Sequence, residues 1–279
     1  MEEKSMRYTA TAQASARARR ASDSPAARGL ARTGLAARGV LYILIGWVAV
    51  MVAFGKTSGS QASQSGALHL LAKQPFGLVL LWLLGIGFAG YALWRFSEAA
   101  FGVAGEGTGA GPRLKSLFRG LVYAFFAFLT FEIITGTAGN SAKKQQDLTA
   151  KVMHDPGGRV LVGVVGAVIV IIGVGLVIQG LRRTFLKYLQ TSQMSLRARR
   201  IVDRLGMIGI AARGVVFALA GVLVIDAAVS YKPSKAGGMD KALLILRDQP
   251  FGPVLLVLAA LGLIIFGFYG LCEARWRKV

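Results

Sequence analysis

GLAARGVLYILIG, residues 34–46, places an arginine, Arg38, at the start of a long apolar run. Nearly the same stretch, GIAARGVVFALAG, returns at residues 209–221 with Arg213 in the matching position. A further Arg-Gly pair, beginning at Arg119, opens an apolar run between these two stretches. A pattern that returns in this way indicates an internal structural repeat.

The composition indicates an integral membrane protein. Of the 279 residues, 54% are hydrophobic and only 16% are charged, whereas about a quarter of the residues in an ordinary soluble domain are charged. Six apolar runs approach the roughly 20 residues needed to cross a bilayer core about 30 Å thick. They cover approximately residues 35–55, 76–97, 117–136, 157–181, 210–230 and 251–273. We therefore expect an all-α integral membrane protein with six transmembrane helices.

Fixed spacings group these helices into three tandem two-helix hairpin repeats. In each unit 37 residues separate the arginine from a proline, and the pairs are Arg38 and Pro75, Arg119 and Pro156, and Arg213 and Pro250. In each unit 60 residues separate the same arginine from a polar residue that closes the second helix, namely Glu98, Gln179 or Glu273. Three equal units can be arranged around a pseudo-threefold axis.

The expected organisation of the chain follows from these markers. It comprises a disordered basic cytoplasmic arm (1–30), repeat 1 (31–101), a linker (102–116), repeat 2 (117–183), a basic cytoplasmic linker (184–204) and repeat 3 (205–279). The arm lacks the continuous apolar core of a secretory signal peptide. A short amphipathic helix is expected before the second helix of a unit, with apolar pairs Leu68/Leu71 and Leu243/Leu246 and a weaker Thr149/Val152.

The second helix of each unit is rich in glycine. Pairs such as Gly85/Ala89 and Gly163/Ala167 follow the small-xxx-small pattern, which lets two helix backbones approach closely in lipid. Tight packing within the bundle is the simpler interpretation of these glycines. A permeation path along the second helices is the functional alternative.

The unit resembles that of a bacterial family of uncharacterised membrane proteins, classed as a domain of unknown function. Repeat 1 carries AARGVLY, LLAKQPFG and GYALWRFSEA, and repeat 3 carries AARGVVF, LRDQPFG and YGLCEA. Repeat 2 departs most, with LFRGLVY, MHDPGG and LVIQG. The resemblance covers most of the chain after about residue 30. It implies a six-helix protein of the bacterial inner membrane and supplies no activity.

Positive charge is expected to mark the cytoplasmic side. Of the 33 Lys and Arg residues, 23 lie in the arm, the connectors between units and the C-terminus, and ten lie in the connectors within units. We therefore predict that both termini are cytoplasmic, with the bilayer and its anionic head groups as partners. The net charge of +20 also raises the question of nucleic acid. Because the charge lies between apolar runs, no nucleic-acid partner is expected, and no protein partner is indicated.

The repeated arginines and the closing polar residues suggest a charge ring. Each unit is a hairpin, so its opening arginine and its closing residue lie on the same membrane side. In the charge ring, the arginines contact the closing residues within or between units, and its members are Arg38, Arg119, Arg213, Glu98, Gln179 and Glu273. Such pairing would relieve unpaired charge near hydrocarbon. In the alternative, the arginines only anchor the helices by reaching the head groups.

Two acidic residues stand where the repeats differ. Thirteen residues after the arginine, unit 1 has Met51, whereas units 2 and 3 have Glu132 and Asp226. Carboxylates within apolar sequence are candidate proton or ion sites. The alternative is that both lie at the outer interface in contact with water, because each stands near the end of its span.

The sequence leaves three classes of function open. The first is a non-enzymatic membrane scaffold or interaction protein, and the second is a small transporter or channel that uses Glu132 and Asp226. The third, an intramembrane enzyme, is disfavoured because no nucleophile–base pair or metal motif stands out. His69 and His154 have no Cys or second His close in sequence, so no metal and no cofactor are expected.

Overall fold

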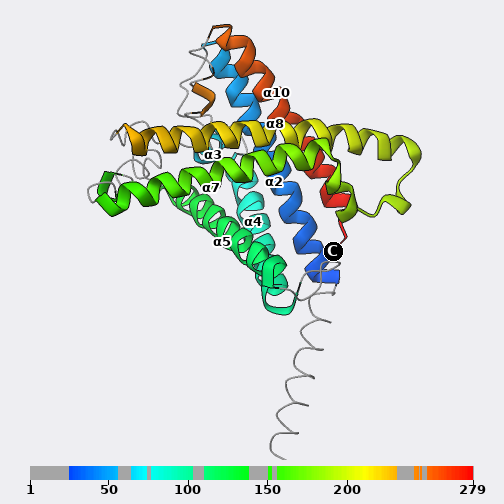
Figure 1. Ribbon diagram of the computed structural model, residues 1–279. Helices are drawn as coiled ribbons and strands as arrows, with labels where there is room; N and C mark the ends of the chain where they lie inside the picture. Colours follow the sequence, from blue (N-terminus) through cyan, green and yellow to red (C-terminus); the bar gives the residue numbers. More distant parts are fainter. Residues whose placement is uncertain are drawn as a thin grey trace, which may run out of the picture.

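The computed structural model describes residues 25–55, 64–73, 77–102, 110–137, 150–152, 156–230, 242–244, 246 and 250–278. Within these residues six helices are long and apolar enough to cross a membrane (Figure 1). They are α2 (Pro25–Ala53), α4 (Gly77–Phe101), α5 (Ala110–Ile134), α7 (Pro156–Leu181), α8 (Leu196–Val229) and α10 (Gly252–Trp276). The predicted all-α membrane fold with six spans is thereby confirmed.

Several helices begin earlier than their apolar runs. Helix α2 begins at Pro25, inside the predicted arm, and α5 begins at Ala110, inside the predicted linker 102–116. Helix α8 begins at Leu196, where the Ser195 side chain caps it by accepting a hydrogen bond from the Ala198 amide at 3.2 Å. Hydropathy marks only the membrane-embedded part of a helix, whereas Ala and Arg favour helix outside it as well.

The length of α8 exceeds what a bilayer requires. Its 34 residues extend about 51 Å at 1.5 Å per residue, compared with a hydrocarbon core of about 30 Å. A helix of this length tilts in the membrane or projects from it. In Figure 1, α8 and its neighbour α7 lie side by side and run across α2 and α10.

The closest helix packing occurs between the predicted units rather than within them. The second helix of one unit packs along the first helix of the next, in the pairs α4 with α5 and α7 with α8. The last helix, α10, packs along the first, α2, in the same way. Within units, α2 contacts α4 and α8 contacts α10, whereas α5 and α7 are not a packed pair among the described residues. The six helices therefore follow one another in space in the order α5, α4, α2, α10, α8 and α7, with units 1 and 3 in contact through α2 and α10.

Glycines bring the backbones of two of these pairs together. A methyl group on Gly39 of α2 would lie 2.7 Å from the Gly267 carbonyl oxygen of α10, and one on Gly267 would lie 2.6 Å from the Gly39 oxygen. Gly173 of α7 and Gly214 of α8 form the same reciprocal contact, at 2.8 and 2.7 Å. No larger residue fits at these crossings without moving a helix.

The prolines open the second helices in two different ways. Pro156 is the first residue of α7, as its position in the repeat predicts. In the third unit Pro250 lies in the turn before α10, and Pro253 occupies the first turn instead. Phe251 between them has a left-handed backbone with φ 61°, which separates the turn from the helix. Pro75 lies outside the described residues.

The short helix expected in the first unit is present as α3 (Gln64–Ala72). Leu68 and Leu71 are both buried, and α3 contacts α2, α4 and α5. In the third unit Leu243 is buried within the helical residues 242–244. The apolar side of these segments therefore packs on the bundle. In the second unit, Val152 is exposed and Thr149 lies outside the described residues.

Candidate functional site

The arginines of the three repeats line one cavity. Arg38 from α2, Arg119 from α5 and Arg213 from α8 meet there with Gln179 and Glu273. The cavity has a volume of about 60 Å³, several times the roughly 10–15 Å³ that one water molecule needs. Arg277 adds a fourth guanidinium. We call this space the arginine cavity. The opening arginines of all three units and the closing residues of units 2 and 3 are thus brought together, whereas Glu98 does not line the cavity.

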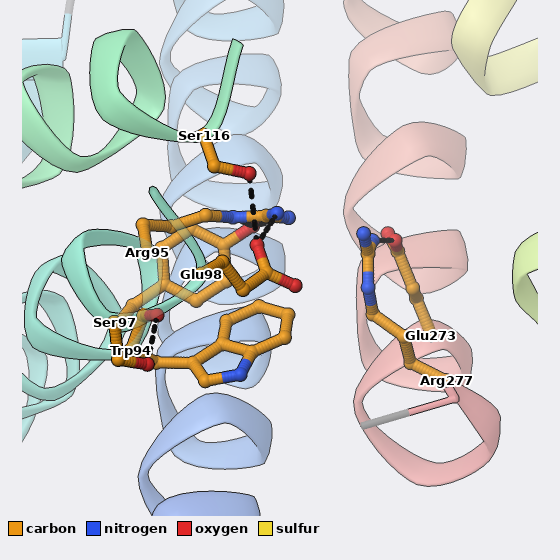
Figure 2. A network of polar contacts seen from close by, with 8 residues as sticks. Trp94, Arg95, Ser97, Glu98, Ser116, Glu273 and Arg277 are labelled. Atoms are coloured by element: carbon orange, nitrogen blue, oxygen red, sulfur yellow. Dashed lines mark hydrogen bonds and ion pairs between the residues drawn. The ribbon is translucent and has the colours of Figure 1, made fainter. Parts of the chain in front are cut away.

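Glu273 connects the first and last helices of the chain, α2 and α10. Its Oε2 accepts a hydrogen bond from Nη2 of Arg38 on α2. Its Oε1 pairs with Nη1 of Arg277, the residue that follows α10 (Figure 2). The three side chains are buried, with exposed fractions between 7 and 11%. The Arg38–Glu273 pair joins unit 1 to unit 3, so this contact of the charge ring is made between units.

Glu98 has other partners than the charge ring assigns to it. Nη1 of Arg95, three residues earlier on α4, contacts its Oε2 at 2.5 Å, and the Ser116 hydroxyl of α5 donates to the same oxygen at 3.0 Å (Figure 2). Arg95 also donates to the Tyr91 hydroxyl, at 2.7 and 3.0 Å. Arg95, on the same helix, therefore forms the ion pair with Glu98. The Ser116 hydrogen bond links α4 to α5. The motif Trp-Arg-Phe-Ser-Glu contained this signal in its i, i+3 spacing.

Arg119 and Arg213 form no ion pair or hydrogen bond among the described residues. The guanidinium of Arg213 lies 4.8 Å from the ring centroid of Phe266, 4.9 Å from that of Phe217 and 5.1 Å from that of Tyr42, and its Nε is buried without a partner. Aromatic faces stabilise a cation but leave its hydrogen-bond donors unused. Arg119 lies within electrostatic reach of other arginines, Arg38, Arg95 and Arg277.

The connector between α7 and α8 covers one side of the arginine cavity. It contains two short 3-10 helices, η2 (Thr184–Tyr188) and η3 (Thr191–Gln193). Phe185 is buried and packs edge to face on Tyr269 with ring centroids 5.3 Å apart. The Gln190 amide donates to the Trp276 carbonyl at 2.8 Å, which fastens the connector to the C-terminal segment. Part of the predicted linker 184–204 is therefore packed on the bundle, because Phe185 is buried.

The two acidic candidates lie away from this cavity. Glu132 on α5 and Asp226 on α8 are half-buried, stand within three residues of the ends of their helices and do not line the arginine cavity. Both residues have interaction partners. Their assignment as a proton or ion site stays a prediction. His69 is half-buried on α3 and His154 lies outside the described residues, which hold no cluster of metal-binding side chains.

Six apolar helices in three units whose arginines meet at one cavity define a multi-pass membrane protein built from internal repeats. The chain belongs to the family described as Domain of Unknown Function (DUF1206), which matches residues 33–102, 114–183 and 208–277. It is 32% identical over 251 residues to the uncharacterized protein YxxB of Bacillus subtilis (strain 168), covering 89% of this chain and 90% of that protein. No solved structure matches the chain.

Proposed function

We propose that this chain is a non-enzymatic scaffold or interaction protein of the bacterial inner membrane. The observation that carries the proposal is the close packing of the last helix on the first, by glycine contacts such as Gly39 with Gly267 and by the Arg38–Glu273 pair. Alternating-access transport needs one group of helices to rock against another. Backbone contacts and a buried ion pair between α2 and α10 oppose such movement and favour a fixed platform.

The surface of this platform is most open on α7. Only 11% of the most apolar 18-residue stretch of α7 is buried within the chain, compared with 44% of the corresponding stretch of α10. Ile171 on α7 and Val254 on α10 are both exposed, so they offer matched positions on two different faces. In the proposal, a partner protein contacts the α7 face.

Site-specific photo-crosslinking in intact cells tests this contact. A photoreactive amino acid replacing Ile171 is expected to form one discrete protein adduct. The same residue replacing Val254 is expected to form none. Adducts of equal yield at both positions, or adducts at neither, contradict the scaffold proposal.

Transport through Glu132 and Asp226 is the competing function. Proton and ion flux into proteoliposomes containing the purified protein is expected to equal the flux into protein-free liposomes. Flux above that baseline that falls in a Glu132→Gln/Asp226→Asn variant would favour the transporter instead. In that case the carboxylates act as titratable groups in the pathway. The amides of the variant cannot take over this role.

The orientation of the chain in the membrane is part of the same proposal. The distribution of Lys and Arg favours cytoplasmic termini, which places the arginine cavity near the anionic cytoplasmic leaflet. A single cysteine at Ser60, in a Cys272→Ser background, is expected to react with a membrane-impermeant maleimide added outside spheroplasts. Reaction only after the cytoplasmic side is opened would reverse the topology.

A further inference from the structure

The arginine cavity contains more positive than negative charge. Arg38, Arg119, Arg213 and Arg277 line it, and Glu273 is the one carboxylate among the lining residues. Glu273 is already shared by Arg38 and Arg277. Arg119 and Arg213 are therefore left without a counter-charge among the described residues. Cations held at partly buried positions without a counter-charge are unfavourable. A site of this composition therefore favours the binding of an anion.

The unused donors indicate which kind of anion fits. The Nε atoms of Arg38 and Arg213 are buried without hydrogen-bond partners. A guanidinium group presents its N–H donors as a planar fork that matches two oxygens of one anion. Several such forks from different helices suit a tetrahedral group with several equivalent oxygens. They suit a spherical ion less well, because it has no oxygens to accept the N–H donors. The cavity volume of about 60 Å³ is several times the roughly 10–15 Å³ needed by a water molecule, which leaves room for such a group.

We propose that the arginine cavity binds an oxyanion of the phosphate type, supplied either as free phosphate or as the phosphate of an anionic lipid head group. Arg119 and Arg213 are its principal ligands, and Arg38 contributes its free Nε while it retains Glu273. The bound anion neutralises arginines from all three units and holds α2, α5 and α8 together at one point. The site does not depend on the scaffold function, because a transporter with the same cavity would bind the same anion.

The position of the cavity is compatible with both sources of phosphate. It is lined by α5 and α7, two helices that are not a packed pair with each other among the described residues. Both helices expose large apolar side chains, including Leu121 and Phe125 on α5 and Val174 and Ile178 on α7. A lipid whose acyl chains lie along these helices would present its head group near Arg119 and Gln179.

The test compares melting temperatures of purified protein with and without defined anions. The variants are Arg119→Gln, Arg119→Lys and Arg213→Gln, and Arg204→Gln is the control because Arg204 is an exposed arginine of α8 that does not line the cavity. One arm adds inorganic phosphate to delipidated protein in detergent. The other compares nanodiscs of phosphatidylglycerol with nanodiscs of phosphatidylcholine. Native mass spectrometry counts the bound phosphate or lipid in each arm.

The wild-type protein and the Arg204→Gln control are expected to gain about 4 °C or more at saturating ligand. Arg119→Gln and Arg213→Gln are expected to lose most of this gain, and Arg119→Lys to keep part of it. In the absence of the anion, Arg119→Gln is expected to melt at or above the wild-type temperature, because repulsion among the arginines is relieved.

The two arms identify the source. A shift with inorganic phosphate supports a site for free oxyanions, and a shift confined to phosphatidylglycerol supports a lipid head group. The proposal is overturned if neither probe shifts the wild-type protein, or if Arg119→Gln and Arg213→Gln shift as much as the control. None of these outcomes depends on photo-crosslinking at Ile171, so the anion site and the scaffold function fail separately.

Discussion

Arg38 on α2 and Glu273 on α10 form a buried ion pair between residues 235 positions apart in the chain. The pair joins the first and third repeats next to the contact of Gly39 with the last helix. In a solenoid, each repeat packs only on its sequence neighbours. Here the last helix packs on the first, so units 1 and 3 are in contact, and a charged contact at the arginine cavity marks their junction.

Two glycines of α7 offer a matched test of the helix packing. A methyl group on Gly173 would lie 2.5 Å from the Ala218 nitrogen of α8, whereas a methyl group on Gly175 would meet nothing within 4 Å. Gly173→Ala is expected to lower the free energy of unfolding by about 1–3 kcal/mol through overpacking. Gly175→Ala is expected to leave it unchanged or to raise it by up to about 1 kcal/mol. Unfolding by SDS in mixed micelles measures both. Equal losses in the two variants would refute close contact between α7 and α8.

A cysteine pair tests the order of the helices. The Cβ position of Gly163 on α7 lies 3.8 Å from that of Ala228 on α8, which is close to the mean Cβ–Cβ separation in disulfides of about 3.8 Å. A Gly163→Cys/Ala228→Cys variant in a Cys272→Ser background is expected to form an intrachain disulfide on mild oxidation. Counting free thiols with a polyethylene glycol maleimide should give none after oxidation. Moving the first cysteine to Gly175 should leave both thiols free, and loss of thiols in that control would mean that the oxidation is unspecific.

The connector over the arginine cavity gives a third prediction. Phe185 is 1% exposed, and its removal is expected to cost about 3–5 kcal/mol and to loosen η2. Phe185→Ala should therefore accelerate tryptic cleavage after Lys187, measured by mass spectrometry of the fragments. Phe118→Ala removes the same side chain from a position that is 60% exposed on α5 and should leave cleavage after Lys187 unchanged. Unchanged cleavage in both variants would show that Phe185 does not fasten the connector.

Much of the architecture could be predicted from apolar runs and spacing. The apolar runs predicted the six helices, and the equal distances from Arg38 to Pro75 and to Glu98, repeated in the other units, grouped them in pairs. A constant spacing fixes how far along a hairpin a residue lies, and three arginines at equal depth can meet. Arg38, Arg119 and Arg213 do line one cavity.

Other features could not be predicted, for identifiable physical reasons. Depth along a hairpin does not determine the direction in which a side chain points, so the repeat spacing missed the preference of Glu98 for Arg95. Packing between units depends on which helix surfaces fit together. The glycine pattern shows that a helix surface carries small residues, but it does not show which helix packs against that surface. The connector with Phe185 was missed because a 3-10 segment of five residues has no periodic pattern to detect.

The central claim is that the first and third repeats are joined through a contact between Arg38 and Glu273. A double-mutant cycle with Arg38→Gln and Glu273→Gln tests it most directly, with the free energy of unfolding measured for all four proteins. Arg38→Gln removes one of the two guanidinium partners of Glu273, and Glu273→Gln removes the carboxylate that Arg38 and Arg277 share. Each single change is therefore expected to cost about 3 kcal/mol. The double variant should be at least about 1.5 kcal/mol more stable than the sum of the single losses implies. Losses that add to within about 0.5 kcal/mol would contradict the claim, because residues that do not touch behave independently.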